Sequence, residues 1–388
     1  MKKLLPLLLS VYCGIPVGSS GQPIHATLTA PGILHITNDS IPNNYTNITL
    51  EWQFLVNGLT RQKGIIPGLQ LPPGHPRTVR LPLGTPAPGE EAILKIVWRN
   101  GPRTRPPLAG QTLRFKPWGG DIRVPVAGEL SYSDSGDAFT ISSPSLLLSF
   151  DKETGWIRRY EVDHYPLLTD TNGLRPTLPS PPHLQLFSTS TGSRMVIVHT
   201  EYTLPDLSCL LHLSYTVNAA GDLLVEQTLE TDTTRGDTLL HPIDHFGMNW
   251  MLQPGFDSTS WYGPAPEDPA DTPPSIHLSS LSAATPAKNV RWWNIRDPEG
   301  KGFRLTADSN FLHQLSIAPP EGITPPGAAA PPGAITPPGA AAPPASIDTP
   351  GNVLKIDGDL THPPALPLHY HVAFKITPLT SIKNPHVR

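Results

Sequence analysis

The sequence has little charge and almost no cysteine. Only 15% of its 388 residues are charged, the formal net charge is -4, and no run of basic residues is longer than two. A groove for nucleic acid needs clustered Lys and Arg to neutralise phosphates, so this composition excludes nucleic acid as a partner. The two cysteines, Cys13 and Cys209, are too few for a framework of disulfides.

The sequence also offers little room for helices. Proline accounts for 49 residues and glycine for 32, which together make up about a fifth of the chain. Because proline breaks helix interiors, this density excludes a helical bundle. The 8 Trp, 9 Tyr and 10 Phe can still form a core of ordinary size, which excludes full disorder. The composition therefore predicts an all-β protein with many proline-rich turns.

The N-terminus carries the longest apolar run, and this run is shorter than the roughly 20 residues that a membrane span needs. Two lysines precede the apolar residues 4–17, and residues 18–20 are small. This layout is typical of a secretory signal peptide, so we expect residues 1–20 to be removed and the protein to be exported, to the periplasm or outside the cell. A lipoprotein modified at Cys13 is the alternative, which the bulky tyrosine before it disfavours.

Two regions with strand patterns follow. Residues 23–115 contain about six or seven short β-rich runs separated by turns, and this number predicts a β-sandwich of immunoglobulin-like size. The Asn-Gly pair at 57–58 is a strong hairpin signal. After a linker at 116–138, about thirteen strand-like runs between residues 139 and 383 predict a large two-sheet sandwich.

One segment fits neither sandwich. Residues 323–334 and 335–346 match at ten of twelve positions, which indicates a tandem duplication inside a Pro-rich insertion at 319–351. Its prolines favour an extended, solvated chain. We interpret the insertion as a tolerated surface loop. A rigid spacer or a ligand for proline-recognising domains is the alternative.

Six short phrases of the second region stand in a characteristic order. They are SFDKETGW at 149–156, PLLT at 166–169, WYG at 261–263, NVRW at 289–292, EGKG at 299–302 and VLKID at 353–357. Their order and spacing resemble the C-terminal, small-chain domain of the large bacterial β-galactosidases. The first region, with Glu51-Trp52 and the hairpin at 57–58, resembles the immunoglobulin-like domain before it. The resemblance implies an immunoglobulin-like β-sandwich followed by a galactose-mutarotase-like β-supersandwich.

The chain departs from this family where the family carries its chemistry. The resemblance places two catalytic glutamates in a (β/α)₈ barrel that precedes both domains, and nothing in this sequence alternates strand and helix over the roughly 250 residues that a barrel needs. The family's sugar-facing tryptophan loop is replaced here by GDLTH at 358–362. We therefore predict an accessory, galactoside-binding protein without catalytic residues, whose implied partner is a separate β-galactosidase chain. A scaffold module or a degenerate remnant is the alternative.

Aromatic residues are the candidate sugar-binding groups. The C–H faces of sugars stack on aromatic rings, so we expect a binding platform on the strands of the WYG and NVRW phrases. Neighbours on a strand point to opposite faces of a sheet, so one of Trp292 and Trp293 should be buried and the other exposed. The alternative is that all of these rings belong to the core or to an interface. The candidate residues are Trp261, Tyr262, Trp292, Trp293 and Glu267.

Histidines give no metal site in the sequence. His241 and His245 are four residues apart with Asp244 between them, but Pro242 argues against a helix, and we interpret both as ordinary turn histidines. His369 and His371 share one face of a strand, but no Cys, Asp or Glu partner is expected within reach of that strand. We therefore predict no metal ion and no cofactor.

Carboxylates leave one enzymatic alternative open. On the concave face of a mutarotase-like sandwich, a histidine and a carboxylate can perform acid–base chemistry on a sugar ring, which makes a sugar epimerase-type enzyme a minor alternative. The sequence does not show which of the strand and turn carboxylates converge. They are Glu201, Glu226, Glu230 and Asp232.

Overall fold

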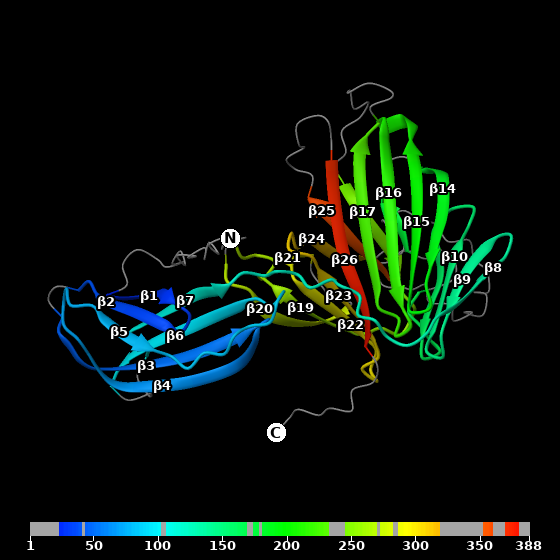
Figure 1. The fold of residues 1–388 in the computed structure, drawn as a ribbon. Helices are drawn as coiled ribbons and strands as arrows, with labels where there is room; N and C mark the ends of the chain where they lie inside the picture. The colour runs from blue at the N-terminus through cyan, green and yellow to red at the C-terminus, as the bar shows by residue number, and fades with distance from the viewer. Residues whose placement is uncertain are drawn as a thin grey trace, which may run out of the picture. The chain divides into compact units, whose positions relative to one another are not determined.

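The structure, a computed structural model, is almost entirely antiparallel β-strand (Figure 1). The all-β prediction is therefore confirmed. Among the described residues no helix has both the length and the apolar character needed to span a bilayer. The structure describes residues 23–40, 43–101, 106–168, 174–177, 181–232, 245–269, 272–281, 286–318, 352–359 and 369–379.

Three predicted segments lie outside the described residues. They are the signal peptide at 1–20, the repeats within the Pro-rich insertion at 319–351, and the segment with His241 and Asp244. His245 is described as the first residue of a strand.

The first of two compact units ends at Asp121 and also includes the described residues 272–275. Trp52, Phe54 and Trp98 lie in its core between two sheets. The predicted hairpin is present, because Asn57 and Gly58 both have positive φ and join two adjacent strands. One sheet has the order β1 (Ile24–Ala30), β2 (Ile33–Asn38), β5 (Arg77–Arg80), and the other β4 (Leu59–Leu71), β3 (Tyr45–Val56), β6 (Ala92–Asn100), β7 (Ala109–Lys116).

The second unit contains two larger sheets that enclose one core. The ten-stranded sheet has the order β21 (Ala287–Val290), β24 (Leu312–Ala318), β25 (Val353–Asp359), β18 (His245–Met251), β13 (Leu174–Thr177), β11 (Ile157–Val162), β10 (Leu146–Asp151), β9 (Ala138–Ser142), β8 (Ser131–Asp134), with β12 (Tyr165–Pro166) beside β11. The nine-stranded sheet has the order β14 (His183–Thr191), β15 (Met195–Leu204), β16 (Cys209–Asn218), β17 (Leu223–Thr231), β26 (His369–Leu379), β23 (Gly302–Ala307), β22 (Trp292–Arg296), β19 (Ser258–Gly263), β20 (Ser275–Ser280). A short 3₁₀ turn, η1 (Pro205–Leu207), connects β15 to β16.

The last described strand lies in the middle of the nine-stranded sheet. β26 pairs with β17 on one side and with β23 on the other (Figure 1). Burial alternates along β15 and β17 and along β16 up to its last residue, so one face of these strands packs into the core and the other faces outward. This pairing brings side chains of residues 195–231 and 369–379, which are far apart in the sequence, onto one outward face.

The predicted linker is only partly a linker. Its residues 131–134 form β8, the edge strand of the ten-stranded sheet. The residues before β8 are tied to the second unit by hydrogen bonds, in which Asn218 Nδ2 donates to Pro125 O (2.7 Å) and Leu130 N donates to Ser193 O (2.7 Å). The linker therefore contributes a strand to the second sandwich.

Candidate functional site

The four predicted aromatic residues form two stacked pairs on adjacent strands. Trp261 lies opposite Trp293, with ring centroids 5.3 Å apart, and both belong to the core of the second unit. Tyr262 lies opposite Trp292, with centroids 6.1 Å apart. Because neighbours alternate along a strand, this second pair lies on the other face of the sheet.

The expectation that one of Trp292 and Trp293 is exposed is wrong. Trp293 is 0% exposed and Trp292 only 7%. The reason is local cover on the outer face, where the Arg304 guanidinium lies 4.6 Å from the centre of the Trp292 ring. Trp261 and Tyr262 are 4% and 0% exposed, so none of the four rings offers an open face to a ligand.

Glu267, the fifth predicted residue, is exposed in the loop after β19. It does not belong to either of the two strands that carry the aromatic pairs. Because the four rings are buried, they leave no open aromatic surface beside it. The structure therefore does not assemble the predicted platform from these five residues.

Mostly polar side chains instead gather on the outward face of β14, β15, β16, β17 and β26. Two neighbouring rows cross these strands, because residues paired in the sheet lie directly opposite each other. The first row is Ser188, His199, Ser214 and Glu226; the second is Leu186, Glu201, His212, Thr228 and His371. We call these two rows the polar face.

His212 links two of the carboxylates that the sequence could not place. Its Nε2 lies 3.2 Å from Glu230 Oε1, and its Nδ1 lies 3.8 Å from Glu201 Oε1. Glu230 also lies 3.7 Å from His369 Nδ1, on the neighbouring strand β26. The result is a continuous chain of two imidazoles and two carboxylates at the outer surface.

The expectation that His369 has no carboxylate partner within reach is therefore wrong. Its partner, Glu230, is the residue directly opposite on β17. His371 in turn lies with its Nδ1 3.2 Å from the Thr228 hydroxyl. Neither contact is visible in the sequence, because the two strands are far apart in the chain and no local pattern marks them as neighbours.

The remaining two predicted carboxylates differ in their surroundings. Glu226 belongs to the polar face and makes no hydrogen bond or ion pair with any described residue. Asp232 follows the end of β17 and is buried, at 6% exposure, away from the rows. The structure thus brings three of the four carboxylates to one surface.

The polar face is hollowed. A depression of about 500 Å³ opens over it, and its described lining contains no Lys, Arg, Trp, Tyr or Phe. Aliphatic side chains border the rows on both sides, Ile197 and Leu224 on one and Leu210 on the other. The residues that line the hollow are Ser188, His199, Thr200, Glu201, His212, Leu213, Ser214, Glu226, Thr228 and His371.

This lining suits a ligand rich in hydroxyl groups. Carboxylates accept hydrogen bonds, hydroxyls do both, and each neutral imidazole donates from one nitrogen and accepts at the other. A histidine held between two carboxylates is also suited to general acid–base chemistry. Within the described part of the chain, no group of His, Cys, Asp and Glu has the geometry to hold a metal ion.

A larger depression of about 630 Å³ lies beside residues 127–131 of the linker, but fewer ionisable side chains line it. Ser143 and Ser145 line it, and both hydroxyls already donate to the carbonyl of Ala219, at 2.7 and 3.1 Å. These serines connect two loops of the fold. We therefore place the candidate site at the polar face.

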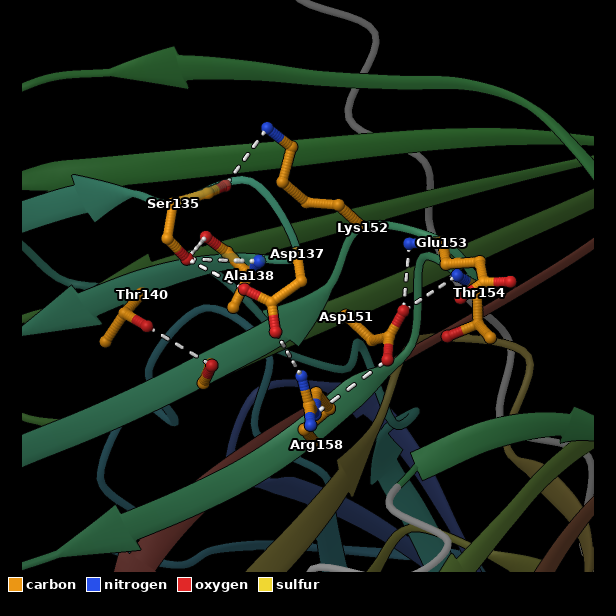
Figure 2. Close-up of polar contacts among 10 residues, drawn as sticks. Ser135, Asp137, Ala138, Thr140, Asp151, Lys152, Glu153, Thr154 and Arg158 are labelled. Carbon is orange, nitrogen blue, oxygen red and sulfur yellow. Dashed lines mark hydrogen bonds and ion pairs between the residues drawn. The ribbon is translucent and has the colours of Figure 1, made fainter.

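The SFDKETGW segment at 149–156, which resembles the β-galactosidases, forms the end of β10 and the turn that follows it. Asp151 Oδ1 accepts hydrogen bonds from the backbone N–H groups of Glu153 (2.9 Å) and Thr154 (3.0 Å), which closes the connection between β10 and β11 (Figure 2). Arg158 joins this turn to the neighbouring one, with ion pairs to Asp151 (3.8 Å) and Asp137 (3.5 Å). The polar residues of the phrase thus shape the backbone.

Cys209 is no candidate nucleophile. It is buried at the start of β16, and burial raises the pKa of its thiol to about 11. The reactive form of cysteine is the thiolate, and a raised pKa makes this form rare at neutral pH.

No protein-family model matches this chain. A β-galactosidase of Priestia megaterium (strain DSM 319 / IMG 1521) is 21% identical over 214 residues, which cover 45% of this chain and 20% of the relative. The chain thus spans about a fifth of the length of this relative. The similarity links the chain only distantly to the β-galactosidases.

Two solved structures align with most of the chain at low TM-scores. The alignment with a TPR-domain containing protein from Parabacteroides distasonis ATCC 8503 covers 89% of this chain and 58% of that protein's chain, with 9% identity and a TM-score of 0.30. An uncharacterised protein from Listeria monocytogenes EGD-e, solved with glucose, magnesium and calcium, covers 92% and 30%, with 14% identity and a TM-score of 0.19.

Proposed function

We propose that this chain is a carbohydrate-binding protein distantly related to the β-galactosidases and that it binds sugar in the hollow of the polar face. The observation that carries the proposal is the chain of Glu201, His212, Glu230 and His369 beside an open depression of about 500 Å³. The distant similarity to a β-galactosidase supports a sugar as the ligand.

Recognition at this face would rest on hydrogen bonds. Each sugar hydroxyl both donates and accepts, so carboxylates and imidazoles on neighbouring strands can bind adjacent hydroxyls of one ring. The bordering aliphatic side chains of Ile197, Leu210 and Leu224 would contact the C–H edges of the ring. Because no large aromatic ring lines the described hollow, we expect a dissociation constant of about 1 mM.

We further propose that the chain acts as an exported accessory to glycoside hydrolysis, together with a separate catalytic chain. The signal-like layout of residues 1–20 supports export. The described residues alternate no strands with helices, so they contain no barrel of the kind that holds the catalytic glutamates in the β-galactosidases that the sequence resembles. We expect the purified chain to release no product from an aryl-galactoside, and turnover that a carboxylate substitution in this chain abolishes would contradict the accessory role.

Binding can be tested by ligand-observed NMR titration with galactose and galactose-containing oligosaccharides. His212→Ala should weaken binding at least severalfold, because it removes the ring that joins Glu201 and Glu230. His25→Ala is the matched control, because His25 also pairs with a carboxylate, Asp39 at 3.4 Å, and is 36% exposed against 37% for His212. If none of the sugars binds, or if both variants bind equally well, the polar face is not a sugar site.

A sugar epimerase-type activity is the second candidate, and the position of His212 between two carboxylates favours it. A base that takes the proton of the anomeric hydroxyl and an acid that protonates the ring oxygen would together break the C1–O5 bond. The reverse steps would close the ring with either configuration at C1. Polarimetry of freshly dissolved α-galactose tests this, and a rate equal to that of buffer would exclude it.

A further inference from the structure

The two carboxylates that line the hollow, Glu201 and Glu226, and the neighbouring Glu230 are not equivalent. Glu201 and Glu230 both contact His212, and Glu230 also contacts His369. Glu226 is half-buried in the row beside them, opposite Ser214, and no described side chain pairs with it. The hollow therefore contains one carboxylate that makes no ion pair or hydrogen bond with any described side chain.

The cation in the nearest row does not pair with this carboxylate. Lys375 lies on β26, where it is opposite Leu224 in the row adjacent to Glu226. Its ammonium donates to the carbonyl oxygen of Arg123 at 3.0 Å, and no ion pair joins it to Glu226. The lining of the hollow itself contains two glutamates, Glu201 and Glu226, and no lysine or arginine.

We propose that the preferred ligand of this face is an amino sugar whose ammonium group lies against Glu226. This inference rests on the proposed sugar site. A half-buried carboxylate without a partner is stabilised by a bound cation. A uronic acid would place its carboxylate next to those of Glu201 and Glu226, and like charges in contact oppose binding. The charge of the hollow thus orders three sugars of similar size, with galactosamine before galactose and galactose before galacturonate.

The test compares these three probes by ligand-observed NMR at neutral pH and low ionic strength. We expect galactosamine to bind roughly two- to fivefold more tightly than galactose, the range typical of one partly exposed ion pair. Glu226→Gln should remove this preference, so that galactosamine and galactose bind about equally, and added salt should reduce the preference in the unmodified protein. Glu153→Gln, in the exposed turn after β10, is the control with the same change of charge.

The outcomes separate the two proposals. Equal binding of galactosamine and galactose, or a preference that Glu226→Gln retains, overturns the amino-sugar inference but leaves the sugar site. Failure of all three probes to bind overturns both. If Glu226→Gln does not fold, as judged by circular dichroism, Glu226→Asp keeps the charge and should keep part of the preference; loss of the preference in Glu226→Asp alongside unchanged galactose binding would also contradict the inference.

Discussion

Gly302 is the position where one added methyl group should damage the second unit most. It begins β23 with φ +153, and it pairs with Arg296 on one side and Leu379 on the other. A Cβ at this position would overlap the carbonyl oxygen of Ile295 and would lie 2.9 Å from its carbonyl carbon and 3.0 Å from Arg296 Cα. All three atoms belong to the backbone of β22, so no side chain can rotate to make room.

The expected loss in the free energy of unfolding is estimated from two contributions. An alanine at positive φ costs about 1–3 kcal/mol. Moving β22 away from β23 weakens at least one ladder hydrogen bond, which adds about 1 kcal/mol, and it loosens the packing of Phe303 on Trp250, whose ring centroids are 4.2 Å apart. We expect Gly302→Ala to lower the free energy of unfolding by about 2–4 kcal/mol, more than the roughly 1 kcal/mol of an average single substitution.

The assay is urea denaturation followed by tryptophan fluorescence and circular dichroism. Gly136→Ala is the control, because Gly136 has no positive φ and no atom lies within 4 Å of its added Cβ. This control should change the unfolding free energy by less than about 0.5 kcal/mol. If Gly302→Ala is within about 1 kcal/mol of the control, the backbone overlap is not real and the reasoning fails.

Three further predictions concern stability. Gly155→Ala should cost about 2–4 kcal/mol, because Gly155 has φ +75 and its Cβ would overlap the Tyr202 hydroxyl; a thermal melt equal to that of the unmodified protein would contradict this. Gln227→Met should raise the unfolding free energy by about 1–2 kcal/mol, because the buried amide of Gln227 has no hydrogen-bond partner among the described residues; denaturation that shows a loss instead would mean that the amide is satisfied. Stability should also fall in alkali, because burial raises the pKa of the Cys209 thiol from 9.0 to about 11 and that of Tyr202 from 10.0 to about 12. The folded state holds these protons more tightly than the unfolded state, so the contribution is complete below about pH 9 and is lost as the pH rises through 11 and 12; Cys209→Ala should delay the onset of this loss in a pH titration of the melting temperature.

Much of the fold could be predicted from local patterns. The density of proline and glycine excludes long helices, and short runs between turn residues predict strands. The Asn57-Gly58 turn joins two strands as expected, because this pair adopts positive φ at little cost. The opposite orientation of Trp292 and Trp293 also follows from the alternation of side chains along any strand.

The candidate site depends on which strands become neighbours, and local sequence does not determine that. Glu230 meets His369 because β26, the last described strand, pairs with β17 in the middle of the sheet. The burial of Trp292 could not be predicted from local sequence either, because it depends on Arg304 of another strand, which covers the outer face. Alternation along a strand decides which side chains share a face and is encoded by adjacent residues. The partners across that face are decided by pairing between distant segments, whose choice depends on how the whole sheet buries its core.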